Sequence, residues 1–255
     1  GQRIGFIGLG LMGRPMTENL LSAGASIVGH NRSQQVIEDL STKGLTPAAT
    51  PKDVAEAADT LILMLPDTGA VENNLLGKNG VIEGLQSDGL IIDMGTTAVM
   101  ATRQFAAATE EAGGGYVDAP VSGGAVGAQG ASLSIMAGGS DTAFSRAKPI
   151  FEVLGQNISH VGDVGAGQVT KTVNQVIVGL TIGAVSEALV LAESAGVDPA
   201  RVREALMGGF ATSRILELHG QRMIEDNFEP GGRAKTQSKD MFEAKEFATA
   251  KPRSL

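Results

Sequence analysis

Three polar residues stand close together in a long apolar segment. Lys171, Asn174 and Gln175 lie at positions i, i+3 and i+4, so a helix there places them on one face. A lysine among apolar turns is unfavourable unless it is paired or functional. Loss of hydration lowers the pKa of a lysine toward the range that suits proton transfer. The pattern predicts either an acid/base lysine or a lysine that extends its ammonium group to solvent.

A glycine-rich turn near the start of the chain could hold phosphate groups. The turn is Gly8-Leu9-Gly10-Leu11-Met12-Gly13, between a short apolar run and a helical pattern. In a dinucleotide fingerprint, the first two glycines let the backbone approach pyrophosphate and the third lets the helix pack closely on the strand. The helix N-terminus then offers free N–H groups to the anion. The alternative is a glycine-rich turn without a ligand.

The residues after the second predicted strand select the cofactor. An NAD site usually has an acidic residue there that binds the ribose 2′-hydroxyl. This chain has His30-Asn31-Arg32-Ser33 instead. Arg32 can pair with a 2′-phosphate, and Asn31 and Ser33 can donate hydrogen bonds to it. The sequence therefore favours NADP, with NAD as the alternative if Arg32 stacks on adenine or faces water.

Two further motifs involve polar residues in small or charged surroundings. Ser122-Gly123-Gly124 leaves a predicted strand with little side-chain bulk, and successive N–H groups there can form an anion-binding nest. A small carboxylate substrate suits such a nest, although a Ser-Gly-Gly turn can also be purely structural. Lys239-Asp240, near the end of the chain, by itself reads as a surface ion pair at the start of a helix.

Short β-type runs alternate with helical stretches in the first part of the chain. Several runs are almost entirely Ile, Leu, Val or Met, as expected for strands that are buried on both faces. The alternation predicts a Rossmann-type, doubly wound α/β sheet. The expected strands are Arg3–Ile7, Ser26–Gly29, Thr60–Leu65, Leu90–Asp93, Tyr116–Asp118, Leu133–Ala137 and Ile158–His160, and expected helices include Pro15–Ala23, Gln34–Ser41 and Ala101–Ala112.

The pattern becomes helical after residue 163. We expect an NAD(P)-binding domain over residues 1–163 and an all-α domain for substrate binding and oligomerisation over residues 164–255. Its expected helices are Gln168–Ala195, a helix capped by Asp198 that includes Val202–Met207, and Ser213–Glu225. The apolar run Val176–Ala192 is shorter than the roughly 20 residues of a membrane span. We expect a buried helix there, no membrane, and a homodimer or homotetramer.

Composition excludes some classes of site and partner. The net charge of −8 disfavours nucleic acid as the main partner. The chain has no cysteine, which excludes disulfides and thiolate metal sites and fits a cytoplasmic protein. Its three histidines lie far apart in the sequence, so we expect no metal site. Glycine is abundant at 35 of 255 residues and without a period, which indicates tight turns and close approach to a ligand.

Together and in this order, the four motifs resemble the β-hydroxyacid dehydrogenase family, which has 6-phosphogluconate dehydrogenase-like folds. The resemblance runs from Gln2 to about Phe247. It implies that Lys171 is catalytic and that Ser122, Gly123, Gly124, Asn174 and Gln175 bind the substrate. The expected cofactor contacts are then Gly8, Gly10, Leu11, Met12, Gly13, Asn31, Arg32, Ser33, Leu65, Pro66, Thr96 and Lys239.

The resemblance implies an oxidoreductase that transfers hydride between NAD(P)H and a small β-hydroxy acid or semialdehyde. The pair Asn174-Gln175 resembles 2-hydroxy-3-oxopropionate (tartronate semialdehyde) reductases, whereas 3-hydroxyisobutyrate dehydrogenases tend to have Asn at the second position. The Arg32 region resembles NADPH-using glyoxylate and succinic semialdehyde reductases. Both remain alternatives. Imine reductases resemble this fold but generally lack the lysine, and a catalytically silent NADP-binding module is the non-enzyme alternative.

Members of the family usually continue beyond the Lys-Asp motif with further helices. This chain reaches Leu255 soon after that motif. We therefore expect the helical domain to be incomplete at its C-terminal end.

Overall fold

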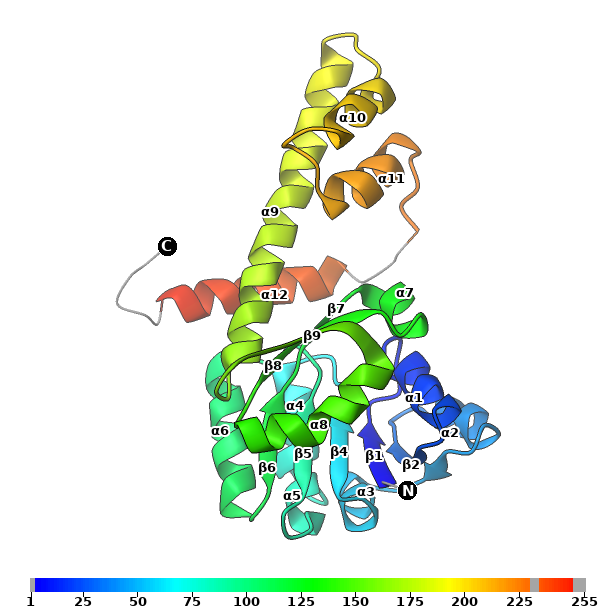
Figure 1. Cartoon of the computed structure of the whole chain (residues 1–255), viewed down its shortest axis with the longest axis vertical. Helices are drawn as coiled ribbons and strands as arrows, with labels where there is room; N and C mark the ends of the chain where they lie inside the picture. The colour runs from blue at the N-terminus through cyan, green and yellow to red at the C-terminus, as the bar shows by residue number, and fades with distance from the viewer. Residues whose placement is uncertain (1–2, 230–233, 250–255) are drawn as a thin grey trace. The chain divides into compact units, whose positions relative to one another are not determined.

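The computed structural model describes residues 3–229 and 234–249. The chain divides into two compact units, Gly1–Lys171 and Thr172–Leu255. Strands and helices alternate in the first unit, and the second consists of helices (Figure 1). The expected fold class, a Rossmann-type α/β sheet followed by an all-α part, is confirmed. The predicted domain boundary between residues 163 and 164 stays a prediction.

The elements of the first unit follow one another with short connections. Its strands are β1 (Arg3–Ile7), β2 (Ser26–His30), β3 (Thr46–Pro47), β4 (Thr60–Leu63), β5 (Leu90–Asp93), β6 (Gly115–Asp118), β7 (Val121–Ser122), β8 (Leu133–Gly138) and β9 (Gly155–Gly162). Its helices are α1 (Gly13–Ser22), α2 (Gln34–Ser41), α3 (Pro51–Ala57), α4 (Thr68–Leu76), α5 (Val81–Gly84), α6 (Val99–Glu111), α7 (Gly124–Gln129) and α8 (Asp141–Leu154).

The sheet has the strand order β3-β2-β1-β4-β5-β6-β8-β7, with β9 paired to β8. Strands β1 to β6 pair in parallel, whereas β8 is antiparallel to β6 and β7. The chain order reverses beside β1, because β2 lies on one side of it and β4 on the other. Ligands of such sheets bind at the carboxyl ends of the strands near this reversal. The loops after β1, β2, β4 and β5 therefore meet at one edge.

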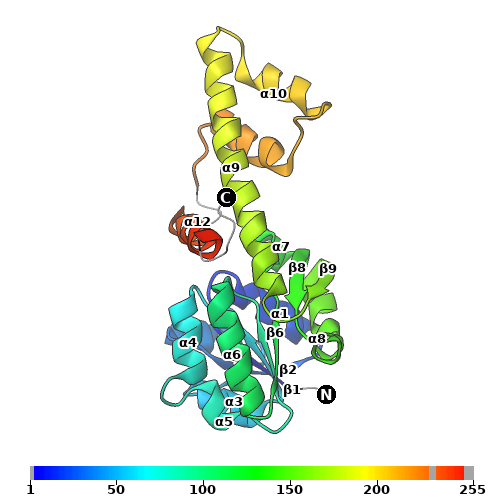
Figure 2. The same ribbon diagram turned by 90° about the vertical axis from the view of Figure 1, so that its left-hand side faces the viewer.

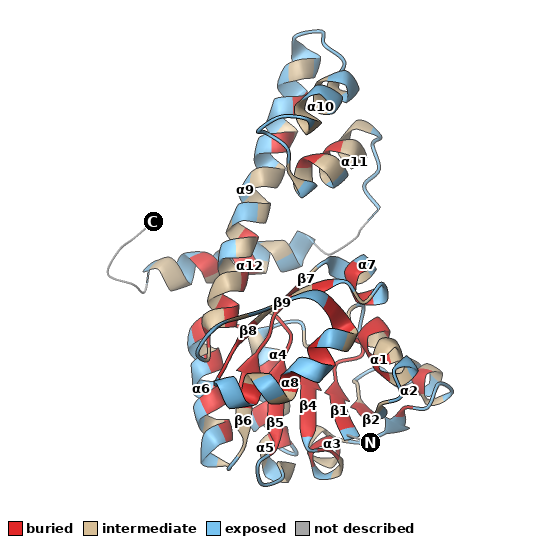
Figure 3. Ribbon diagram, in the orientation of Figure 1, coloured by how far each residue is buried: buried red, intermediate tan, exposed pale blue. Residues whose placement is uncertain are grey.

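Helices cover both faces of the sheet, and strand side chains alternate between them. Figure 2 shows α4 and α6 on one side and α1 and α8 on the other. Ile62 and Ile92 belong to the core under α1, α2, α7 and α8, whereas Leu61 and Ile91 belong to the core under α3 to α6. All four of these side chains are fully buried. Figure 3 shows β4 and β5 in the colour of buried residues. The continuous apolar runs in the sequence reflect this two-sided burial.

Side-chain caps fix where several helices begin. Thr50 and Asp53 form a capping box at the start of α3, and the Asp67 carboxylate accepts the N–H of Ala70 at the start of α4. Strand β4 ends at Leu63, so Met64 and Leu65, which the sequence predicts as the end of this strand, lie in the loop that leads to Asp67.

Over residues 172–229 and 234–249, the second unit contains most of a long helix and four shorter elements. They are α9 (Ala166–Ser194, which begins in the first unit), α10 (Pro199–Met207), the π-helix η1 (Leu216–Gly220), α11 (Gln221–Ile224) and α12 (Ala234–Thr249). Asp198 caps α10 through the N–H of Ala200, as the sequence predicts. The single helix predicted over 213–225 is instead η1 followed by α11.

Helix α9 is less covered than its sequence suggests. Of its most apolar 18-residue window, 6% is buried, and Ile177, Leu180 and Leu191 are 60%, 65% and 71% exposed. The expectation of a buried helix over Val176–Ala192 is therefore wrong within this chain, because hydropathy indicates a need for apolar cover but not what supplies it. By length and composition alone, α9 could cross a membrane, which is weak evidence for one.

Candidate active site

The turn between β1 and α1 has the geometry that a dinucleotide phosphate requires. Gly8 has φ +97°, and a Cβ atom there would collide with the carbonyl oxygen of Met64. A Cβ atom on Gly13 would collide with the carbonyl oxygen of Gly8, whereas one on Gly10 would meet open space. In this described segment, no side chain caps α1 and no acidic residue lies in its first turn. The helix N-terminus therefore fits an anion.

The loop after β2 is tied to this turn by Asn31. Its Oδ1 accepts the N–H of Leu9 at 3.0 Å, and its Nδ2 donates to the Ser33 carbonyl at 3.2 Å. These bonds use the amide that the sequence assigns to a 2′-phosphate, so Asn31 shapes the loop in this structure. Arg32 and Ser33 are exposed. Their predicted contact with the cofactor stays a prediction.

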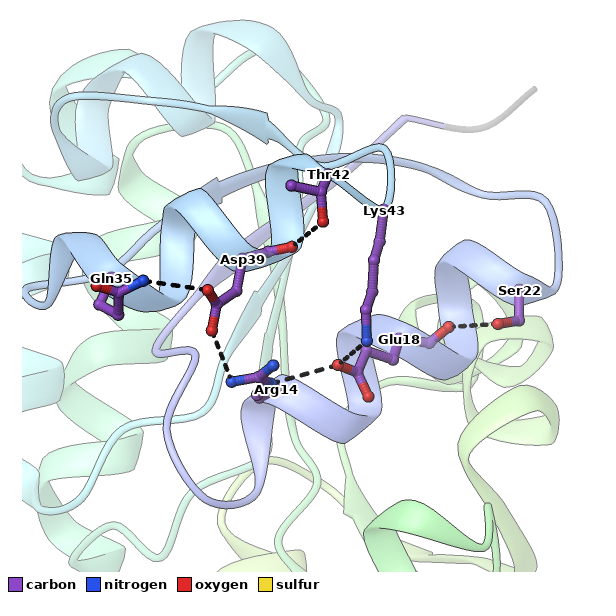
Figure 4. A network of polar contacts seen from close by, with 7 residues as sticks. All are labelled: Arg14, Glu18, Ser22, Gln35, Asp39, Thr42 and Lys43. Atoms are coloured by element: carbon purple, nitrogen blue, oxygen red, sulfur yellow. Dashed lines mark hydrogen bonds and ion pairs between the residues drawn. The ribbon is translucent and has the colours of Figure 1, made fainter.

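A network of charged side chains joins α1 to α2 (Figure 4). Arg14 pairs with Glu18 at 3.3 Å and with Asp39 of α2 at 3.1 Å, while Lys43 pairs with Glu18 at 2.8 Å. The hydrogen bond from Lys43 is the largest cause that lowers the pKa of Glu18. Exposed ion pairs contribute little energy singly. The network nevertheless links the helix after the phosphate turn to the helix after the Arg32 loop.

The loops after β4 and β5 complete the cofactor edge of the first unit. Leu65 and Thr96 are half-buried and Pro66 is exposed. The backbone bonds from Met64 to Ile7 and from Met94 to Leu63 extend the parallel ladder beyond the strands, at 2.9 Å each. Apart from Lys239, the predicted cofactor residues thus lie on loops that leave the same edge of one sheet or, for Gly13, at the first residue of α1.

Lys171 lies beside the predicted substrate turn. Its side chain is 8% exposed, and its Nζ donates to the carbonyl oxygen of Val121 at 2.9 Å. Val121 immediately precedes Ser122, where β7 ends. Gly123 and Gly124 follow with φ values of +135° and +61°, which few other residues adopt. The structure thus brings together a buried ammonium group and the Ser-Gly-Gly turn, two motifs that are about 50 residues apart in the sequence.

Two buried aspartates at the ends of β5 and β6 were not assigned a role from the sequence. Asp93 and Asp118 are register partners on β5 and β6, and both are fully buried. Asp118 accepts the N–H groups of Gly165 and Gln168, at 2.7 and 2.8 Å. Burial raises the pKa of Asp118 to about 7, while these two hydrogen bonds act to lower it. The Asp118 carboxyl therefore holds the start of α9.

Tyr116 completes the buried polar group. Its hydroxyl donates to Asp93 at 3.2 Å, and the Thr97 hydroxyl donates to the same carboxylate oxygen at 2.6 Å. Burial is the main cause that raises the pKa of Tyr116, and the two aspartates raise it further. A neutral tyrosine hydroxyl is thus available as a donor to Asp93 across the neutral pH range.

The remaining predicted site residues lie in the second unit. Asn174 donates to the Oε1 of Gln175 at 2.8 Å, and the Nε2 of Gln175 donates to Asp240 at 2.6 Å and to Gln237 at 3.0 Å. Lys239 pairs with Asp240 at 3.2 Å. The Lys-Asp pair was expected at the surface and at a helix start, but Asp240 is buried and the pair lies in the second turn of α12.

The missed residues had only partial signals in the sequence. Asp118 opens the segment that contains Ser122, and Gln168 follows Gly165-Ala166-Gly167. An acid at a strand end and a glutamine at a helix start are visible in the sequence. That they contact each other is not, because their pairing depends on how β6 and α9 pack.

Two family models together match nearly the whole chain. The NAD binding domain of 6-phosphogluconate dehydrogenase matches residues 3–162, and the NAD-binding domain of NADP-dependent 3-hydroxyisobutyrate dehydrogenase matches residues 165–252. The 2-hydroxy-3-oxopropionate reductase of Escherichia coli (strain K12) is 47% identical over 252 residues, or 97% of this chain and 85% of that protein. The chain belongs to the β-hydroxyacid dehydrogenase family.

Other members of the family show the same likeness. The 3-hydroxyisobutyrate dehydrogenase of Pseudomonas aeruginosa is 37% identical over 216 residues, or 85% of this chain and 72% of that protein. The solved structure of Mycobacterium tuberculosis 3-hydroxyisobutyrate dehydrogenase with L-serine has a TM-score of 0.91 and 29% identity, covering 100% of this chain and 89% of that one. This member of the family is therefore an oxidoreductase that binds a nicotinamide dinucleotide.

Substitutions of two glycines separate cofactor binding from folding. We expect Gly10→Ala to melt close to the wild type, because its Cβ meets no other atom, yet to raise the Kd for NADPH by about tenfold or more, ~1.4 kcal/mol, because the Cβ fills the approach of the pyrophosphate. Gly13→Ala should lose about 1–3 kcal/mol of stability as well. Calorimetric melting and fluorescence titration measure both. Unchanged NADPH binding by Gly10→Ala would contradict this position of the cofactor.

Proposed function

We propose that this enzyme is an NADP-dependent reductase of a short semialdehyde acid, with 2-hydroxy-3-oxopropionate as its best-supported substrate. The carrying observation is the buried Lys171 ammonium group beside the Ser122-Gly123-Gly124 turn. The likeness to a 2-hydroxy-3-oxopropionate reductase supports the substrate, and so does the Asn174-Gln175 pair. The 3-hydroxyisobutyrate and glyoxylate/succinic semialdehyde activities are the alternatives.

In this proposal, the protein binds the carboxylate of the substrate and protonates the carbonyl oxygen of the substrate. The backbone N–H groups and hydroxyl of Ser122-Gly123-Gly124 bind the carboxylate. An ammonium group has three N–H donors, so Lys171 can keep its bond to Val121 while it donates to the substrate oxygen. The bound nicotinamide supplies the hydride. Asn174 and Gln175 as substrate contacts and Lys239 as a cofactor contact remain parts of the proposal.

Removal of the lysine tests this assignment. We expect Lys171→Ala to bind NADPH normally and to lose about 10²–10⁴-fold in kcat, the usual contribution of a general acid/base. Lys148→Ala is a suitable control, because that lysine pairs with Glu152 on the surface of α8. Steady-state kinetics with a panel of semialdehydes and imines measures both variants. Near-normal turnover by Lys171→Ala would refute the acid/base role, and a wild type inactive on the whole panel would favour a silent NADP-binding module.

The preference for NADP rests on the loop after β2. Arg32 and Ser33 are exposed there, and no acidic residue occupies the loop. The family model that matches residues 165–252 describes an NADP-dependent 3-hydroxyisobutyrate dehydrogenase, which also supports NADP as the cofactor.

Substitution of Arg32 tests the cofactor choice. Arg32→Ala should lower the ratio of kcat/KM for NADPH to that for NADH by about tenfold or more, since a charge-assisted bond to the 2′-phosphate is lost. Arg201→Ala, whose side chain is 86% exposed on α10, should leave the ratio unchanged. A wild-type preference for NADH of about tenfold would overturn the proposal.

We also propose that the protein is a cytoplasmic homodimer or homotetramer. Val173, Ile177 and Leu180 are 53%, 60% and 65% exposed, and their spacing places them on one face of α9. A second copy that covers this face would remove it from water. Light scattering should then give a multiple of 26.1 kDa. A monomer that sediments with membranes would contradict both parts of this proposal.

A further inference from the structure

The side chain of Gln168, in the first turn of α9, binds the loop that follows β5. Its Nε2 donates to the carbonyl oxygen of Gly95 at 2.8 Å, and its Oε1 accepts the N–H of Thr97 at 3.1 Å. Both bonds are buried, and Gln168 is 1% exposed. One side-chain amide thus forms hydrogen bonds with the backbone of both residues that flank Thr96, the predicted cofactor contact after β5.

The backbone of Gln168 is held from the opposite side. Its N–H donates to the Asp118 carboxylate at 2.8 Å, in the first turn of α9. Lys171 follows three residues later, one turn along the same helix. The glutamine therefore lies directly between the loop that carries Thr96 and the helical turn that carries the lysine.

Asp93 binds the same loop from the side of the sheet. Its two carboxylate oxygens accept the N–H of Gly95 at 3.1 Å and the hydroxyl of Thr97 at 2.6 Å. The loop from 95 to 97 is thus bound by Asp93 from the sheet and by Gln168 from α9. Asp93 binds this loop and Asp118 binds the backbone of Gln168. Because the two aspartates are register partners on adjacent strands, the distance between them is fixed by the sheet.

Few other side chains could replace the glutamine. Glutamate offers an acceptor to Thr97 but, when ionised, no donor to Gly95, and methionine offers neither at similar length. Asparagine is one methylene shorter. Each replacement leaves a buried backbone group without its partner, which costs more than the bond itself contributes. The amide donor and acceptor of Gln168 therefore set both the distance of the 95–97 loop from α9 and its orientation.

We propose that Gln168 is a positioning residue, which fixes the Thr96 loop relative to the helical turn that carries Lys171. The proposal rests on the proposed function, because the two groups it aligns are the nicotinamide edge and the proton donor. A displacement of about 1 Å between reacting groups can cost about 10²-fold in rate. Gln168 thus acts on the reaction through Thr96 and Lys171.

Two substitutions at this position test the proposal. We expect Gln168→Met to lower kcat by about 10–100-fold, while the Kd for NADPH changes much less. The deuterium isotope effect with deuterated NADPH should rise, because hydride transfer becomes more rate-limiting. In the protein without ligands, exchange of the Thr97 amide proton should speed up. Gln168→Glu should keep that proton protected, because the carboxylate still accepts it.

Acid rescue distinguishes positioning from simple stability. Asp93 and Asp118 face the same buried region and raise the pKa of a carboxyl introduced there. As the pH falls, the protonated Gln168→Glu side chain can donate to Gly95, so its kcat relative to that of Gln168→Met should rise. Thr109→Val serves as the control, because it removes a buried side-chain bond within α6, to the Phe105 carbonyl.

The outcomes are distinct. If both Gln168 variants only melt at a lower temperature, as Thr109→Val should, and keep the wild-type isotope effect and KM in the folded fraction, Gln168 is merely structural and the inference fails. If Lys171→Ala also keeps its turnover, the proposed function fails as well. Loss of turnover in Lys171→Ala beside normal kinetics in Gln168→Met overturns the inference alone.

Discussion

An ammonium group held out of water beside a backbone carbonyl is the constraint on which the rest of this structure depends. A buried charge is expensive unless a partner replaces its hydration. The Val121 carbonyl provides such a partner for Lys171, but only if β7 and the first turns of α9 keep a fixed separation. A shift of either element would break the bond or open the ammonium group to solvent.

Two features of the fold keep this separation. An aspartate at the end of a parallel strand binds the start of α9, and glycines lie where the backbones of α9 and β8 pack closely against it. Asp118 binds the start of α9, whose positive helix end favours a carboxylate. A Cβ atom on Gly167 would lie 2.9 Å from the Asp118 carboxylate, and one on Gly138 would lie 2.7 Å from it. Larger residues at either position would push α9 or β8 away. These glycines therefore act on the site by permitting the close packing of α9 and β8 on Asp118.

Local patterns in the sequence predicted much of the fold and part of the site. The bounds of β1, β5 and α2 follow directly from apolar runs and helical spacing. The glycine turn and the Ser122 turn were visible because their chemistry depends on consecutive residues. Lys171 stood out because a lysine in an apolar helix is unusual.

The sequence could not show which distant residues share a contact. The Gln168 and Asp118 hydrogen bond joins residues 50 positions apart, and no periodic pattern encodes such a pairing. The sequence also did not show that the Asn31 amide binds Leu9, 22 residues away, while its predicted cofactor contact stays a prediction. The exposure of α9 escaped notice for a related reason, because hydropathy does not identify the surface that covers an apolar helix.

A crystal structure of the protein with NADP+ and a short β-hydroxy acid would test the central claim most directly. The account predicts that the acid's carboxylate binds the Ser122-Gly123-Gly124 turn and that its hydroxyl oxygen lies within about 3.2 Å of the Lys171 Nζ. A hydroxy acid that binds the cofactor-containing protein with its hydroxyl oxygen far from the Lys171 Nζ would contradict it.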